Sequence, residues 1–434
     1  MDKTYYTYRI RVANDEHVQV EKLNAQDKLL GEPFGIFRYK EKSEEINSLV
    51  QIALSAELKN SKQARVFGEA LFDALFDNTL RQDFVNFHFQ VVQQERQLLR
   101  VELDIDEQGM PEIAALPWEF MCLPAMANLG EIWMGTDPNL VFSRRRAQWH
   151  PASPIQLEQA EKLRIALVIA APKDLGTVEY ETVQAVLEEL ANNHSECVEL
   201  LPVVNPATPN AIDALLEKQP HIFHFIGHGR LQDDDGEDVG QIALVKKVLN
   251  TASWVDAGFF SGLFNRHRPG IVLLQACEGG MLSASQAFVG VASKIVQQNV
   301  PVVVAMQYEV YNITACQFAY EFYQRLAQDA PVDIAAQNAR RTIALETQYR
   351  KRDFATPVIF MRVRDGYLFK RQGGEIEPDA NTISSESNQK LAPKGETQIT
   401  QNVRQHGEKN FNFGQASGFR IGDDYYQSES SQKN

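Results

Sequence analysis

Basic charge is scarce in this sequence of 434 residues, in which 43 lysines and arginines stand against 57 aspartates and glutamates, for a net charge of −14. Binding of nucleic acid or of an anionic membrane needs a basic surface, so we expect neither partner. Long apolar runs are also missing. No stretch of eighteen apolar residues occurs, and the segment Met1–Tyr5 holds no apolar core of a signal peptide. We therefore expect a cytoplasmic protein without a membrane span.

Cysteine pairs and phosphate-binding loops are absent from the sequence as well. The four cysteines, Cys122, Cys197, Cys277 and Cys316, are far apart and form no Cys-x-x-Cys pair. This spacing argues against a disulfide framework and against a zinc ribbon. No Gly-x-Gly-x-x-Gly or Walker loop follows any expected strand, which argues against a nucleotide enzyme. We expect no cofactor.

Two short apolar runs are present, and each ends in a reactive side chain. They are His221-Ile-Phe-His-Phe-Ile-Gly-His228-Gly229 and Gly270-Ile-Val-Leu-Leu-Gln-Ala-Cys277-Glu-Gly-Gly280. β-Branched and aromatic runs closed by glycine are typical of buried strands in a parallel sheet. Such sheets carry their chemistry at the carboxyl ends of the strands. Because a thiol nucleophile needs a nearby base, we select Cys277 and His228 as candidate catalytic residues.

These residues also have structural interpretations. A free cysteine is usually a small core residue, and a histidine in a turn usually hydrogen-bonds a neighbouring group. His221, His224 and His228 could together hold a metal, but strand alternation sends the first two to opposite faces, and no acid or thiol stands at a fixed spacing. The acidic segment 233–235 lacks the ligand pattern of an EF-hand. We therefore expect no metal site.

Composition divides the chain into four regions. Residues 1–146 alternate as strands at first and then follow helical spacing, which predicts an α+β region. In residues 147–370 strands alternate with helices. This pattern predicts an α/β fold with a mostly parallel sheet of about six strands, flanked by helices, in which 233–238 is an acidic loop and 254–264 a helix. The polar composition of residues 371–400 predicts a disordered linker. Residues 401–434 form a tail.

The sequence resembles CHAT-domain proteins, which are caspase- and separase-like cysteine peptidases of bacteria. The resemblance rests on Phe225-Ile-Gly-His228-Gly229, Gln275-Ala-Cys277-Glu-Gly-Gly280, Val300-Pro-Val-Val-Val-Ala-Met306, Tyr323-x-x-Leu326, Ala339-Arg-Arg341, Thr356-Pro-Val-Ile-Phe-Met-Arg362 with Asp365-Gly366, and Leu116-Pro-Trp-Glu119. Cys277 follows His228 by 49 residues, as in caspases with a Gln-Ala-Cys-x-Gly motif. Glu278 departs from that motif, where caspases have Arg, Gln or Gly. The resemblance covers residues 115–370 well and the first hundred residues loosely, and it implies a caspase-like fold. Residues 1–114 are either a degenerate second caspase-like lobe or a sensing region.

The resemblance also implies a mechanism. Cys277 would attack a peptide carbonyl as thiolate, His228 would move the proton, and the backbone N–H groups of Gly229 and Cys277 would bind the oxyanion. Candidates for the substrate pocket are Gln275, Glu278, Glu309 and Asp233. The three acidic residues among them could also be solvated surface charges, which is the more common case. They favour a basic or neutral residue before the cleaved bond.

The tail contains alternating apolar residues on either side of a glycine-containing segment: Phe411, Phe413, Phe419 and Ile421. Short segments of this kind suit cross-β stacking, and they are similar to the amyloid-like adaptor motifs of bacterial conflict effectors. That similarity implies recruitment by an upstream receptor or adaptor through residues 401–427, or self-assembly. A disordered tail and a hairpin docked on the body are the other interpretations.

We therefore expect a cysteine endopeptidase that acts on protein substrates as a regulated effector in bacterial defence or programmed cell death. The alternative is a catalytically silent caspase-like scaffold or signalling adaptor, because a fold does not fix a function.

Overall fold

The computed structural model describes residues 5–371, except 59, 108, 127–128, 146–151, 235–236, 277–282, 298–299, 309–311 and 365, and except the side chains of 234, 237–238, 283–286 and 312. Contacts within the chain separate a unit Met1–Glu375 from a unit Ile376–Asn434. All described residues belong to the first unit.

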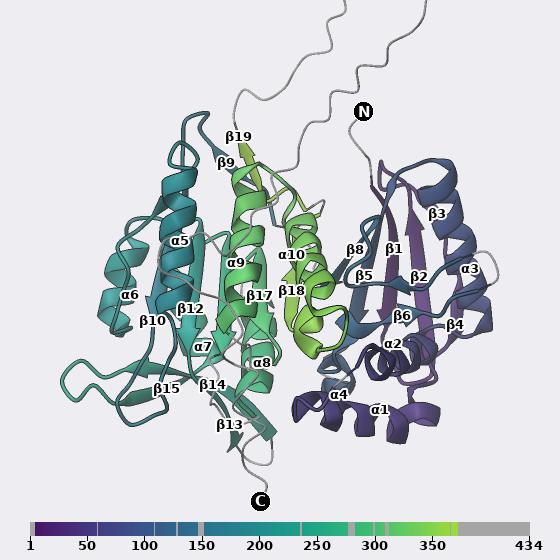
Figure 1. Ribbon diagram of the computed structural model, residues 1–434, viewed down its shortest axis with the longest axis horizontal. Coiled ribbons are helices and arrows are strands. Elements are labelled where there is room, and N and C mark those ends of the chain that lie inside the picture. Colours follow the sequence, from purple (N-terminus) through teal and green to yellow (C-terminus); the bar gives the residue numbers. More distant parts are fainter. Residues whose placement is uncertain are drawn as a thin grey trace, which may run out of the picture. The chain divides into compact units, whose positions relative to one another are not determined.

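One sheet of twelve strands runs through both of the ordered regions expected from the sequence (Figure 1). The pairs from β11 to β17 and from β18 to β1 are parallel, whereas β17–β18 and the pairs made by β2 are antiparallel. The expected mostly parallel α/β fold is therefore confirmed. In order across the sheet the strands are β11 (Val198–Leu200), β10 (Leu163–Ile169), β12 (Ile222–Gly227), β16 (Ile271–Ala276), β17 (Val302–Met306), β18 (Pro357–Met361), β8 (Leu140–Arg145), β5 (Leu98–Ile105), β1 (Tyr5–Val12), β2 (His17–Leu23) and β3 (Leu29–Gly31), with β4 (Phe34–Ile36) also paired to β2.

Helices cover both faces of the second region. On one face α5 (Glu181–Asn193), α9 (Asn312–Ala327) and α10 (Val332–Thr347) share a core with alternate residues of the strands. On the other face α6 (Pro209–Leu216), α7 (Ala257–Gly262) and α8 (Ser283–Gln297) share a second core. Every residue of β12 and β16 is consequently buried. Burial on both faces explains why these strands are apolar throughout instead of alternating.

The first region places its helices against one face of its strands. They are α1 (Tyr39–Leu54), α2 (Ser61–Leu75), α3 (Asn78–His88), the π-helical turn Phe89–Gln94 and the short α4 (Pro111–Ala114). Tyr8, Ile10 and Val12 of β1 are fully buried in this core, as their alternation predicts. The residues between them in β1 face the other side of the strand, where Arg9 Nε lies 2.7 Å from the Glu102 carboxylate of β5. The alternation of apolar and charged residues therefore matches the two faces of the strands.

The two regions meet where β18 runs beside β8. The strands pair through Phe360–Arg144 and Met361–Arg145. Further along, the buried Arg340 of α10 bridges them, because its Nε donates to Pro357 O (2.8 Å) and its Nη1 donates to Phe142 O (3.0 Å). Its guanidinium therefore satisfies a carbonyl on each strand.

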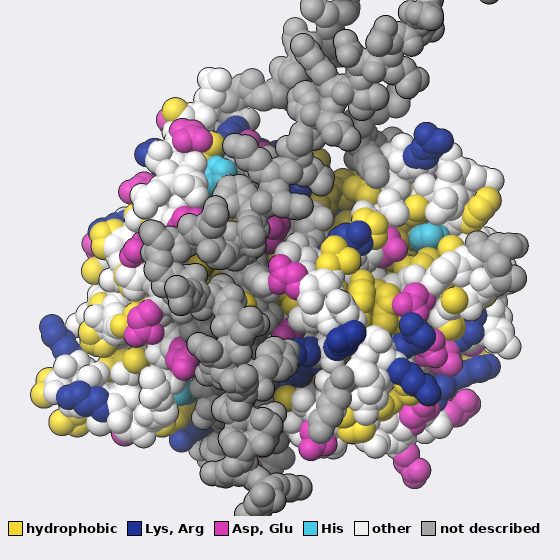
Figure 2. Space-filling model, viewed as in Figure 1, with side chains coloured by type: hydrophobic (Ala, Val, Ile, Leu, Met, Phe, Trp, Pro, Cys, Tyr) yellow, Lys and Arg dark blue, Asp and Glu magenta, His cyan; other side chains and the backbone are white. Residues whose placement is uncertain are grey.

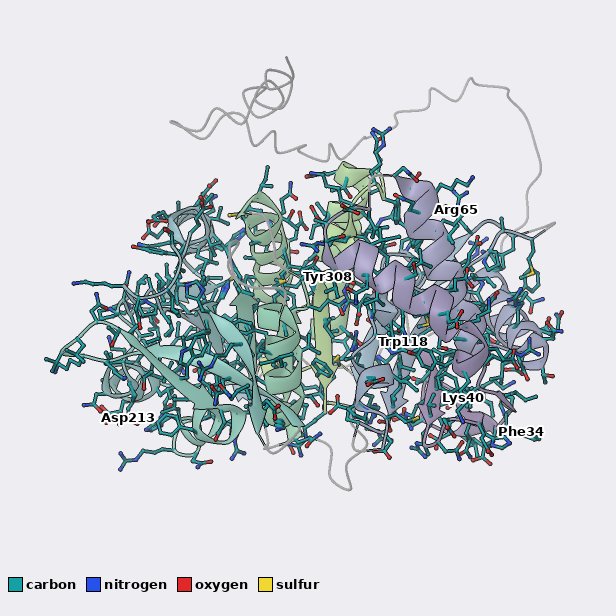
Figure 3. All side chains as sticks on the ribbon, turned by 90° about the horizontal axis from the view of Figure 1, so that it is seen from below. Phe34, Lys40, Arg65, Trp118, Asp213 and Tyr308 are labelled. Carbon is teal, nitrogen blue, oxygen red and sulfur yellow. The ribbon has the colours of Figure 1, made fainter. Side chains whose placement is uncertain are left out.

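A buried ion pair lies at the same boundary. Arg144 of β8 holds the Glu119 carboxylate with two hydrogen bonds, Nε to Oε1 at 2.9 Å and Nη2 to Oε2 at 2.6 Å. Gln307, the residue after β17, donates from Nε2 to the same carboxylate at 3.0 Å. The next residue, Tyr308, lies near the middle of the face viewed in Figure 3, with Trp118 close to it in that view. The segment Leu116–Glu119 thus ties the first region to the end of β17.

Three small sheets complete the described fold. They are β13 (Gly229–Asp234), β14 (Glu237–Val245) and β15 (Ala252–Asp256); β9 (Ile155–Leu157) with β19 (Phe369–Arg371); and β6 (Cys122–Leu123) with β7 (Ile132–Trp133). Two 3₁₀ turns, Trp118–Phe120 and Arg352–Ala355, lie between elements.

The first of these sheets corrects two expectations. Most of the expected acidic loop 233–238 belongs to the hairpin of β13 and β14, where Asp233 pairs with Asp238. The expected helix 254–264 is wrong at its start, because Trp254 pairs with Ala243 across β14 and β15. The helix there is shorter and begins at Ala257, capped by the Asp256 carboxylate. Cross-strand pairing outweighed the local helical spacing.

Among the described helices, none combines the length and the apolar character that crossing a bilayer requires. In the view of Figure 2, acidic and basic side chains are interspersed over the described surface.

Candidate active site

The two apolar runs singled out in the sequence lie side by side as β12 and β16. They are neighbouring parallel strands, and their last paired residues are Gly227 and Ala276. His228 follows directly after the first of these. Cys277 follows the second in the sequence and lies outside the described residues. The strand ends that precede the two candidate catalytic residues are therefore adjacent.

A glycine is required at the end of β12. A Cβ atom on Gly227 would come within 3.1 Å of the Ala170 Cβ and about as close to the Phe225 ring. Real Cβ atoms rarely approach their neighbours so closely, so a side chain here would push the strand end away from its surroundings. The glycine before His228 thus permits the close packing that fixes the start of the histidine segment.

His228 is nearly buried, with 6% of its surface exposed, and its ring has a defined partner. Its Nε2 lies 2.9 Å from the backbone oxygen of Gly176. A carbonyl oxygen only accepts, so Nε2 carries the hydrogen, and in the neutral ring Nδ1 is the unprotonated nitrogen. Burial lowers the pKa of His228, and the hydrogen bond to Gly176 opposes that change. The imidazole is therefore neutral at pH 7, with Nδ1 as the atom able to take a proton.

The loop that carries Gly176 is itself anchored. The Lys173 N–H donates to Asn250 O at 2.9 Å, and the Ala252 N–H donates to the Asp174 carboxylate at 2.7 Å. Both contacts tie the loop to the turn between β14 and β15. This partner of the histidine cannot be recognised from the sequence, because every residue type offers a backbone carbonyl.

A second histidine of β12 lies in a buried polar chain. His224 is fully buried, with Nε2 3.0 Å from Gln275 Oε1 and Nδ1 3.1 Å from the Tyr323 hydroxyl. Gln275 is 2% exposed. Its side chain therefore has an internal partner, and its role in a substrate pocket stays a prediction.

The remaining candidates lie in different parts of the chain. Gly229 is the first residue of β13 and pairs with Ile242. Asp233 is near the end of the same strand and is exposed. The other candidates lie outside the described residues and stay predictions: Glu278, Glu309, Phe411, Phe413, Phe419 and Ile421. Within the described part of the chain, no three His, Cys, Asp or Glu side chains are grouped so that they could hold a metal.

The family model of the CHAT domain matches residues 65–400, well over half of the chain. The chain belongs to the CHAT-domain family. The match extends upstream of the CHAT motifs recognised in the sequence and takes in most of α2 and all of α3 and β5.

Solved structures similar to this CHAT-domain chain include the Arg-specific cysteine proteinase gingipain R (RgpB), with 11% identity and a TM-score of 0.39 over 76% of each chain. The complex of Porphyromonas gingivalis RgpB pro- and mature domains matches with 11% identity and a TM-score of 0.40, over 76% of this chain and 78% of that chain. A search of curated proteins gave no match.

Proposed function

We propose that this CHAT-domain protein is a cysteine endopeptidase that uses Cys277 as nucleophile and His228 as general base and acid. The observation that carries the proposal is the pairing of Gly227 with Ala276 at the ends of two neighbouring parallel strands. The candidate residues come next along each chain, so both side chains would belong to this edge of the sheet. Parallel sheets commonly build active sites at this edge.

The ring geometry supports one assignment of roles. The Nε2–H of His228 is held by Gly176 O, so Nδ1 is the nitrogen that would take the thiol proton of Cys277. The thiolate would add to the peptide carbonyl, and the N–H groups of Gly229 and Cys277 would stabilise the oxyanion. Nδ1 would then give its proton to the leaving amine as the C–N bond breaks. Water would hydrolyse the thioester and regenerate the thiol.

The experiment is a digest of a peptide library by the full-length protein, with the products identified by mass spectrometry. We expect Cys277→Ala and His228→Ala to abolish cleavage while circular dichroism stays that of the wild type. Cys197→Ala, a half-buried cysteine remote in sequence from the site, is the matched control and should retain activity. Cleavage that persists in Cys277→Ala would contradict the proposal. Absence of cleavage by the wild type would favour the catalytically silent scaffold or adaptor.

The substrate pocket is a further part of the proposal. We propose that Glu278, Glu309 and Asp233 favour a basic or neutral residue before the cleaved bond. Reversing one charge at a time, as in Glu309→Lys, should move the preference in the library digest away from Arg and Lys. A preference unchanged by all three reversals would exclude these acids from the pocket.

The regulatory role is proposed from the tail sequence. Phe411, Phe413, Phe419 and Ile421 would recruit this cytoplasmic effector to a receptor or adaptor in bacterial defence or programmed cell death, or would mediate self-assembly. Recruitment would raise the local concentration of the peptidase. In cells, Phe411→Ser with Phe413→Ser should abolish the effect of the protein without lowering the cleavage rate measured in vitro. A double variant as active in cells as the wild type would contradict a role for the tail.

A further inference from the structure

Three buried polar side chains near the site have no part in the mechanism proposed above. They are Tyr323 of α9, His224 of β12 and Gln275 of β16, with exposed surfaces of 0%, 0% and 2%. Two hydrogen bonds join them in a row, Tyr323 to His224 at 3.1 Å and His224 to Gln275 at 3.0 Å. A buried polar group is costly unless it is hydrogen-bonded, so this row needs a physical account.

The direction of each hydrogen bond in the row follows from chemistry. The Gln275 Oε1 only accepts, so Nε2 of His224 donates to it. Burial lowers the pKa of His224 to about 4, so the ring is neutral at pH 7 and its Nδ1 accepts from the Tyr323 hydroxyl. The row therefore has a single arrangement of hydrogens. Such an arrangement holds its members in fixed positions.

The row crosses the two strands that lead to the candidate dyad. In the sheet His224 is opposite Leu273, and Gln275 is opposite Ile226, so the hydrogen bond between them runs diagonally from β12 to β16. His224 lies four residues before His228, and Gln275 lies two residues before Cys277. His224 and Gln275 lie on one face of the sheet, the face covered by α9, and His228 and Cys277 stand an even number of residues further along each chain. A slide of either strand by one residue, about 3.3 Å, would break the row.

We propose that Tyr323, His224 and Gln275 are positioning residues that fix the end of β16 against the end of β12 and thereby set the geometry between Cys277 and His228. The inference rests on the proposed function and deepens it. It gives Gln275 a role through its internal partner rather than through contact with substrate. Displacements of about 1 Å in a reacting geometry cost about 100-fold in rate, so a small relaxation of the row is enough to be measured.

The test uses two mild variants of the full-length protein. Tyr323→Phe removes one hydroxyl, and Gln275→Met keeps the length of the side chain but removes the acceptor. Tyr320→Phe is the matched control, because it makes the same chemical change on the same helix three residues away. Circular dichroism and thermal unfolding establish that each variant is folded.

The first measurement is the rate at which iodoacetamide alkylates Cys277 as a function of pH, read by mass spectrometry of the peptide that contains it. This assay needs no substrate. A thiol beside an imidazole reacts as thiolate well below the pKa of about 8.5 of a free cysteine. We expect the profiles of Tyr323→Phe and Gln275→Met to move up towards that value, while Tyr320→Phe keeps the wild-type profile.

The second measurement is the cleavage of a peptide found in the library digest. We expect kcat to fall roughly 10- to 100-fold in each variant, with KM within about threefold of the wild type, because the geometry changes and not the binding. The kcat of the double variant should be no more than about twofold below that of the less active single variant, because both changes break the same row of hydrogen bonds.

Two results would overturn the inference. One is a Tyr323→Phe protein with the alkylation profile and kcat of the wild type. The other is a Gln275→Met protein with raised KM and unchanged kcat, which would make Gln275 a substrate contact. If the wild type cleaves no peptide while the alkylation profile still moves in Tyr323→Phe, the positioning role stands and the peptidase function does not.

Discussion

Replacing Glu119 by alanine tests how much its buried ion pair with Arg144, next to the boundary between the two regions, stabilises the fold. The two side chains are 0% and 4% exposed, and two hydrogen bonds of 2.9 and 2.6 Å join them. The same guanidinium also donates to the backbone oxygens of Ala114 at 2.9 Å and Leu116 at 2.8 Å. In Glu119→Ala these carbonyl contacts can remain, but the buried cation loses the carboxylate that it contacts among the described residues.

The expected loss follows from the burial of the pair. Removing one member of a buried ion pair leaves an uncompensated charge and costs about 3–5 kcal/mol. Replacing both members, as in Glu119→Leu with Arg144→Met, removes the uncompensated charge. The double variant should therefore be more stable than the single variant by at least about 2 kcal/mol.

The assay is urea unfolding at pH 7, followed by tryptophan fluorescence, to which Trp118 and Trp133 contribute. Both tryptophans are buried in the first region, and Trp133 stacks on Tyr349 from the second region at 4.9 Å. The control is Arg65→Ala, which breaks an ion pair with Glu131 whose side chains are 46% and 35% exposed and which should cost under about 1 kcal/mol. A loss of less than about 1 kcal/mol in Glu119→Ala would refute the reasoning.

Three further predictions concern acid stability, a helix cap and thiol reactivity. Burial lowers the pKa of His224 from 6.5 to about 4, so between these pH values the proton binds to the imidazole in the unfolded chain only. The free energy of unfolding should therefore fall by about 3 kcal/mol on acidification from pH 6.5 to pH 4. In urea unfolding over the same range, a His224→Gln protein should lose less of its free energy of unfolding than the wild type. The Asn60 side chain caps α2 by accepting from the Gln63 N–H at 2.9 Å, so Asn60→Ala should cost about 1 kcal/mol; an unchanged urea midpoint would contradict this. Burial raises the pKa of Cys316 to about 12, so at pH 8 iodoacetamide should modify the half-buried Cys197 faster than Cys316, and equal rates of these two by mass spectrometry would refute this order.

The sequence predicted the strands of the site because their signals are local. The apolar runs closed by Gly227 and by the segment after Ala276 became the buried neighbours β12 and β16. Local reasoning failed at Trp254, where the partner strand that decides the structure lies about ten residues away. It also could not reveal the Gly176 carbonyl, since a backbone group leaves no mark on the choice of residue.

The row of Tyr323, His224 and Gln275 shows the same limit at longer range. Its hydrogen bonds join residues 99 and 51 positions apart. From the sequence alone, His224 is a possible metal ligand, and Gln275 is part of the Gln-Ala-Cys motif and a candidate for the substrate pocket. The contact between them depends on the diagonal register of β12 and β16, which appears only when the strands are assembled.

The shared sheet has a consequence for a nicked chain. β8 ends at Arg145 and pairs with β18 on one side and with β5 on the other. A cut at residues 146–151 would sever the covalent link between the regions but none of these backbone hydrogen bonds, nor the ion pair of Arg100 with Asp333. The two fragments would therefore remain a non-covalent heterodimer, and separating them would need denaturant.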